Sequence, residues 1–321
     1  MQALLAERGG NGLAVCGQSM MSPDLTDVNT GFEQLSQAVQ SDPSAKLFAL
    51  VDGALLLDLP KKCQQRWRAS HGVSLLTGAR GHGAAEVGPL LYELPSQPMN
   101  SDLCSSLLDL TSGKSAGSFI VSRLNLNDLA VSLARFVDVT LSDQSTMVMR
   151  FFDPRVLPFW FQAIKPRYQF ALAECIAHWF HWDHRQVFEN IPLTTAAQAN
   201  EFASFPTHLS AAEEAQLMSA CYPFTLIERF RIEDSAALSK VPVHRQYEFF
   251  SGQIDRAAGH GITDHLDLEI YCTFGLEVGE RFDEHVAILP ALSMVKSGER
   301  FSKAMSTLDI DWNQLKTVND D

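Results

Sequence analysis

The chain has 321 residues, of which 46% are hydrophobic and 20% are charged. A chain of this length can bury about three quarters of its unfolded surface without disulfides or metals, so we expect a globular protein. Its 25 Lys and Arg residues against 38 Asp and Glu residues give a net charge of −13. This excess of acid would repel phosphate groups, so neither nucleic acid nor an anionic membrane surface is expected as a partner.

Cysteine usage suits a reducing compartment, and the N-terminal pattern does not fit a signal peptide. The six cysteines stand far apart with no C-x-x-C pair, which fits neither a disulfide scaffold nor a zinc site. Glu7, Arg8 and nearby glycines interrupt the pattern that a signal peptide needs. The chain has no run of eighteen apolar residues. These features predict a cytoplasmic protein without a signal peptide or membrane anchor.

The first 190 residues alternate between helical and strand patterns. Residues 1–31 are polar and lack periodicity, which predicts a flexible N-terminal arm. The region 32–191 is predicted to be an α/β domain with a mixed, partly antiparallel sheet. The predicted helices of this domain cover residues 32–39, 61–70 and 102–110 and a segment that begins at Asn125 or Asn127. The predicted strands cover residues 47–51, 89–94, 119–121, 137–141 and 146–152. The last two strands are joined by the hairpin loop 142–145.

Residues 192–321 change to a helical pattern with clear start and stop signals. Ser210 and Glu213 form a capping box, which satisfies free amides at a helix start. Pro223 is predicted to begin a second helix. Further helices are predicted from Pro242 to the glycines at 259 and 261, from Thr263–Asp264 onward, and near 299–308. The sequence therefore predicts an all-helical C-terminal lobe.

Three histidines stand close together at His178, His181 and His184, beside Asp183. Imidazole and carboxylate groups are ligands for transition metals, so a metal site is one interpretation. The segment around them is short and aromatic, and its middle resembles a hairpin turn. On a strand, His178 and His181 would point to opposite faces. The spacing favours an aromatic-rich hairpin over a metal site.

Motifs for phosphate binding and nucleophilic catalysis are incomplete. The run Ser112–Ser115 resembles the end of a phosphate-binding loop, but Leu108 stands where the signature needs glycine. No G-x-S-x-G elbow occurs, and no cysteine has a recognisable cationic setting. The sequence therefore predicts neither a catalytic residue nor a cofactor.

An apolar strand pattern ends in the charged run Arg150, Asp153, Arg155, with Pro154 among them. This run could be a charged ligand site, or a partly buried ion-pair network that orders a strand-to-helix junction. We favour the network, with Asp153 capping the helix that Pro154 would start and with Asp52 of the first strand as an additional ion-pair partner.

Four segments taken together, 48–54, 87–94, 120–123 and 150–157, resemble the type VI secretion effector-chaperone family, also known as domain of unknown function 4123. The resemblance covers about residues 32–190. It implies a cytoplasmic adaptor that holds a toxic effector and helps to load it onto the VgrG spike, and it carries no catalytic residue. The positions that match the family motifs are Asp52, Gly53, Glu93, Arg123, Arg150, Asp153, Pro154 and Arg155.

An adaptor would bind its effector through apolar and aromatic surface. The candidate partner-binding residues are Trp160, Phe161, Trp179 and Trp182, with core packing as the alternative for each. Two rival functions are a metal-dependent hydrolase that uses the three histidines and an immunity protein that masks a toxin.

Overall fold

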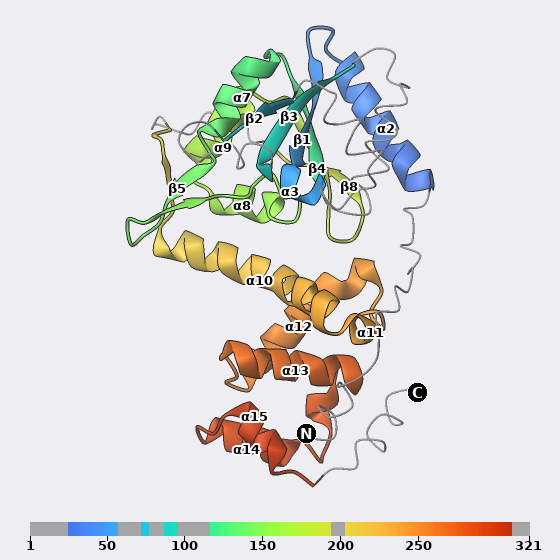
Figure 1. Ribbon diagram of the computed structural model, residues 1–321, viewed down its shortest axis with the longest axis vertical. Helices are drawn as coiled ribbons and strands as arrows, with labels where there is room; N and C mark the ends of the chain where they lie inside the picture. Colours follow the sequence, from blue (N-terminus) through green and yellow to red (C-terminus); the bar gives the residue numbers. More distant parts are fainter. Residues whose placement is uncertain (1–24, 57–71, 77–86, 96–115, 194–202, 310–321) are drawn as a thin grey trace. The chain divides into compact units, whose positions relative to one another are not determined.

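The structure is a computed structural model that describes residues 25–56, 72–76, 87–95, 116–193 and 203–309 (Figure 1). These residues form two compact units, one ending at Cys221 and the other beginning at Tyr222. The first is an α/β unit and the second is helical, which confirms the predicted fold class. The predicted helices at 61–70 and 102–110 and the run Ser112–Ser115 lie outside the described residues.

The larger sheet of the α/β unit has six strands, and every neighbouring pair is antiparallel. This layer contains the antiparallel pairing of the predicted mixed sheet. Mixed pairing occurs in a second, three-stranded sheet. The strand order is β2 (Gly72–Ser74), β3 (Pro89–Leu94), β1 (Lys46–Asp52), β4 (Gly117–Ser122), β7 (His178–Trp182) and β8 (Phe188–Asn190) in the first sheet, and β6 (Thr146–Val148), β5 (Asp138–Thr140) and β9 (Thr207–His208) in the second.

Helices cover both faces of the six-stranded sheet, as Figure 1 shows for α2 on one side and α7 and α9 on the other. Because successive strand residues face opposite sides, Leu47 and Val51 of β1 pack toward α2, whereas Phe48 and Leu50 pack toward the other helices. This two-sided burial explains the continuous apolar run of β1. The helices are α2 (Leu25–Gln40), the short α3 (Gly53–Leu56), α7 (Leu126–Ala134), α8 (Leu157–Ala163) and α9 (Pro166–Ala173).

Local signals fixed several element ends correctly. Helix α7 begins after Asn125, whose side chain accepts a hydrogen bond from the backbone N–H of Asp128, as predicted. The hairpin of β5 and β6 turns at residues 142–145, also as predicted. Helix α2, however, begins at Leu25, so its first turns fall within the segment predicted to be a flexible arm.

The helical region comprises α10 (Ala211–Glu233), α11 (Ser235–Leu238), η1 (Val243–Arg245), α12 (Gln246–Gly259), α13 (His265–Glu277), η2 (Phe282–Glu284), α14 (Leu289–Lys296) and α15 (Phe301–Ser306). The capping box is confirmed, since Glu213 accepts a hydrogen bond from the backbone of Ser210 at 2.7 Å. Pro223 does not begin a helix, because α10 continues through it. Packing of Leu226 and Phe230 in the core outweighs the one backbone hydrogen bond that a proline removes.

The division between the two units falls within α10, whereas the sequence predicted a domain boundary at 191–192. Strand β9 explains why residues beyond 192 group with the α/β unit. It pairs in parallel with β5, and Leu209 and Leu217 join the core of that unit. The helical sequence pattern begins only at Ser210, so β9 and Leu209 precede it and join the α/β unit.

Helix α7 offers a matched test of the α/β core. Leu133 is fully buried, whereas Val131 on the same helix is 67% exposed. We expect Leu133→Ala to lower the free energy of unfolding by about 2–5 kcal/mol and Val131→Ala to change it by less than about 0.5 kcal/mol. Urea unfolding followed by tryptophan fluorescence measures both, since the buried Trp160, Trp179 and Trp182 lie in this unit. Equal effects of the two substitutions would contradict the packing described for α7.

Candidate functional site

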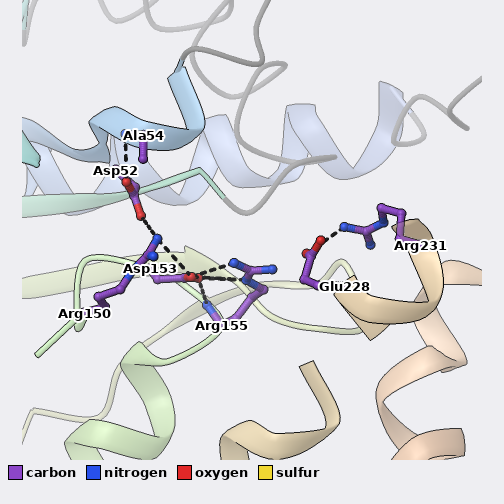
Figure 2. Close-up of polar contacts among 7 residues, drawn as sticks. All are labelled: Asp52, Ala54, Arg150, Asp153, Arg155, Glu228 and Arg231. Atoms are coloured by element: carbon purple, nitrogen blue, oxygen red, sulfur yellow. Dashed lines mark hydrogen bonds and ion pairs between the residues drawn. The ribbon is translucent and has the colours of Figure 1, made fainter. Parts of the chain in front are cut away.

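A cluster of charged residues, which we call the junction cluster, joins the end of β1 to the turn that follows β6 (Figure 2). It consists of Asp52, Arg150, Asp153 and Arg155. Asp52 is the last residue of β1 and is 1% exposed. One carboxylate oxygen accepts the backbone N–H of Ala54 at 3.0 Å, and the other accepts the Arg150 guanidinium. This pair spans 98 positions of the chain and confirms the predicted network.

Asp153 is the second buried carboxylate of the junction cluster. It accepts hydrogen bonds from three donor groups of Arg155: the backbone N–H at 3.0 Å, Nε at 3.0 and 3.3 Å to the two carboxylate oxygens, and Nη2 at 2.7 Å. Arg150 Nη2 lies 4.0 Å from the same carboxylate. Two guanidiniums thus neutralise two carboxylates, and the bidentate geometry fixes Arg155 against the turn.

The local sequence explains why these charges meet. Arg150 and Asp153 bound a tight turn, closed by a hydrogen bond from the Asp153 N–H to the Arg150 carbonyl at 2.9 Å. Between them, Phe151 is fully buried; its ring stacks on Trp160 at 4.8 Å and meets Trp179 edge-on at 6.1 Å. Anchoring this ring in the core holds the flanking charged side chains at the end of the sheet.

Asp153 does not cap a helix, which corrects the prediction for this residue. Helix α8 begins at Leu157, and its N-cap is Val156 without a side-chain hydrogen bond. The Asp153 carboxylate is occupied by Arg155, and Pro154 lies buried in the intervening turn. The junction is therefore closed by ion pairs and not by a cap.

Burial raises the pKa of Asp52, and the Arg150 guanidinium opposes that shift. Half of the Arg150 side chain is exposed, so water also screens this charge. Burial, together with the negative charge of Asp153, raises the pKa of the nearby Cys221 thiol to about 11. Cys221 is therefore protonated at neutral pH and is a poor nucleophile.

The remaining motif residues do not belong to one site. Gly53 donates its backbone N–H to the Gly88 carbonyl at 2.9 Å, beside the junction cluster. Glu93 and Arg123 lie at the opposite end of the sheet, where β1 begins. There Glu93 pairs with Lys46 at 2.9 Å and Arg123 with Asp42 at 2.6 Å. The two partners Lys46 and Asp42 were not predicted, because no local pattern marks an exposed cross-strand pair.

Hydrogen bonds from Ser44, followed by the Arg123 contact, lower the pKa of Asp42 to about 2. The carboxylate is therefore ionised at any physiological pH. This turn residue links the end of α2 to the exposed Arg123 side chain after β4.

The four aromatic residues proposed to bind a partner lie in the core and not on the surface. Trp160 and Trp179 are fully buried, Trp182 is 1% exposed and Phe161 is 4% exposed. Trp160, Phe161 and Trp179 pack on one face of the large sheet and Trp182 on the other. Large aromatic side chains contribute the most apolar area on burial, so they fill the sheet–helix interfaces.

The three histidines lie on the predicted hairpin, formed by β7 and β8. His181 is buried, and burial lowers its pKa, which favours the neutral imidazole. His178 is three positions earlier on β7, so it faces the opposite side of the strand, and His184 follows the strand. Within the described ranges, no group of three His, Cys, Asp or Glu residues is arranged to hold a metal ion.

Residues 47–171 match the family model described as domain of unknown function (DUF4123). This region contains the whole junction cluster. Comparisons with curated proteins and with solved structures gave no match. In the part of the chain that the structure describes, no helix is both long and apolar enough to cross a bilayer.

Arg150 provides a test of the junction cluster. Arg150→Ala would leave the buried Asp52 carboxylate without its charged partner, and we expect it to lower the free energy of unfolding at pH 7 by about 1–3 kcal/mol. The folded protein already holds the Asp52 proton more tightly than the unfolded chain, so ionising Asp52 reduces stability as pH rises above about 4. Without Arg150 the folded pKa rises further, and this loss becomes larger.

The difference in unfolding free energy between the native protein and Arg150→Ala is therefore expected to be small near pH 4 and to grow toward pH 7. Urea unfolding at a series of pH values measures it. Adding Asp52→Asn to the variant removes the titrating group and should flatten the pH dependence. A difference that stays constant with pH would show that Asp52 is not the partner of Arg150.

Proposed function

We propose that this protein is a cytoplasmic adaptor of type VI secretion, which binds a toxic effector and helps to load it onto the VgrG spike without catalysing a reaction. The observation that carries the proposal is the match of residues 47–171 to DUF4123, together with the resemblance of its motifs to the effector-chaperone family. The motif residues Asp52, Arg150, Asp153 and Arg155 gather in one junction cluster.

The chemistry of the junction cluster supports a structural role for the motif. Its two carboxylates and two guanidiniums balance in charge, and both carboxylates are nearly fully buried. A general acid or base needs a titrating group that can reach a substrate, whereas these groups are occupied by each other. An adaptor needs a rigid fold that presents a fixed surface to its partners. The ion pairs of the junction cluster hold the end of the sheet in place and so contribute to this rigidity.

Partner contacts would then come from apolar side chains that remain exposed, because the candidate tryptophans are buried. The candidates among the exposed large apolar residues in the described ranges are Met218, Ile232, Val243 and Leu266, with Val87, Met147, Val148, Val187 and Leu289 somewhat less exposed. They occur in both units, which suits an adaptor that contacts two different proteins.

Affinity purification of the tagged full chain from its native cell tests the proposal. We expect one effector and VgrG to be enriched and identified by mass spectrometry. Deleting the gene should abolish secretion of that effector and leave other effectors unaffected. Complementation with Val131→Ala should restore secretion, whereas Leu133→Ala should restore less because its fold is weakened. Normal delivery of the effector by the deletion strain would contradict the proposal.

Two further measurements distinguish the adaptor from the two rival functions. A stoichiometric zinc or iron signal in protein purified without chelator would favour a metal-dependent hydrolase. Protection of a toxin-sensitive strain by this protein expressed alone would favour an immunity protein. An adaptor should give neither result.

A further inference from the structure

Among the described residues, no strand pairs with the outer edge of β6. This strand lies at the end of the three-stranded sheet and pairs with β5 in the register Asp138 opposite Val148 and Thr140 opposite Thr146. Hydrogen bonds flank the ladder at both ends: the Met149 N–H to the Val137 carbonyl at 2.7 Å and the Leu141 N–H to the Ser145 carbonyl at 2.9 Å.

The direction of each backbone group on β6 follows from these flanking bonds. Hydrogen-bonded and non-hydrogen-bonded pairs alternate along an antiparallel ladder. Pairs 137–149 and 141–145 are hydrogen-bonded, so the pair formed by Val139 and Met147 is hydrogen-bonded as well. The N–H and C=O groups of Thr146 and Val148 therefore point away from β5, toward the open side of the sheet.

This edge is short but accessible, and it lacks two of the features that commonly block pairing, charged residues and prolines. All three residues of β6 are exposed, Met147 by 43% and Val148 by 38%. The run 144–149 contains no charged residue and no proline, although charges and prolines are the usual protection of free edges. Strand edges of this kind bind extended peptides, whose own N–H and C=O groups complete the ladder.

We propose that the outer edge of β6 binds an extended, apolar segment of the effector by strand addition. This proposal rests on the proposed function. Two features of β6 select this kind of occupant. The outward N–H and C=O groups of Thr146 and Val148 can be paired in register by a segment in strand conformation. The side chains of Met147 and Val148 stand on opposite faces of the sheet, so the segment would contact apolar atoms on both faces.

Proline substitution tests the edge without disturbing β5. Val148→Pro removes one outward N–H and places a ring where the added strand would lie. Val286→Pro is the matched control: Val286 is 74% exposed, the preceding His285 has the extended conformation that proline requires (φ −71°, ψ 134°), and no hydrogen bond of the Val286 N–H is present among the described residues. Val148→Thr keeps the backbone donor and the β-branched shape.

The probe is the effector identified by the affinity purification, produced separately and titrated against the full chain. We expect Val148→Pro to raise the Kd at least about tenfold and Val286→Pro or Val148→Thr to change it by less than about threefold. Hydrogen exchange adds a direct readout, with the amides of Thr146 and Val148 exchanging rapidly in the free protein and becoming protected in the complex. Near-UV circular dichroism and thermal unfolding check that each variant is folded.

The outcomes separate this proposal from the function on which it rests. If the native chain binds the effector but Val148→Pro binds it equally well and both amides stay unprotected, the edge is not the binding site while the adaptor function stands. If the free chain is a dimer with both amides protected, a second copy occupies the edge and the proposal is wrong. If no effector is captured, the proposed function fails and the edge proposal fails with it.

Discussion

The buried carboxyl group of Asp52 at the end of a central strand is the constraint around which the α/β unit is arranged. A carboxylate that is 1% exposed loses most of its hydration, and in an apolar interior this loss is unfavourable unless hydrogen bonds and an opposite charge replace the water. The Ala54 N–H and the Arg150 guanidinium supply both. Because Arg150 comes from a distant part of the chain, satisfying one buried charge also fixes where the turn after β6 must lie.

The aromatic core and the junction cluster depend on each other. Phe151 can stack on Trp160 only if the turn from Arg150 to Asp153 closes, and the turn brings Arg150 to Asp52 only if Phe151 is anchored. Such coupling explains why a motif made of charged residues resembles a binding site in sequence while acting as a cross-link in the fold. Both carboxylates of the cluster are already paired, whereas the Arg150 side chain remains half-exposed.

Partner recognition must therefore be sought away from the most distinctive residues. Trp160, Trp179 and Trp182 are buried in the sheet–helix interfaces, and the carboxylates of the charged motif are paired with guanidiniums of the same motif. Among the described residues, the β6 edge offers exposed backbone groups and apolar side chains in a defined geometry. Main-chain recognition suits the proposed adaptor function, because it tolerates sequence variation in the bound segment.

The sequence by itself determined the elements with strong local signals: the two-sided burial of β1, the Asn125 cap of α7, the Ser210 capping box and the turn between β5 and β6. It also suggested the pairing of Asp52 with the Arg150 run, since a lone buried carboxylate needs a cation. Local rules cover these features because the interacting atoms lie within a few residues of each other, or because the charges leave few alternatives.

Tertiary structure decided the rest. It selected the antiparallel order of the large sheet, the continuity of α10 through Pro223 and the burial of Trp160, Phe161, Trp179 and Trp182. It also paired the Asp153 carboxylate with Arg155, so this carboxylate does not cap helix α8. Each of these outcomes depends on which distant surface a side chain meets, and the free energy of that contact outweighs the local preference on which a sequence pattern is based.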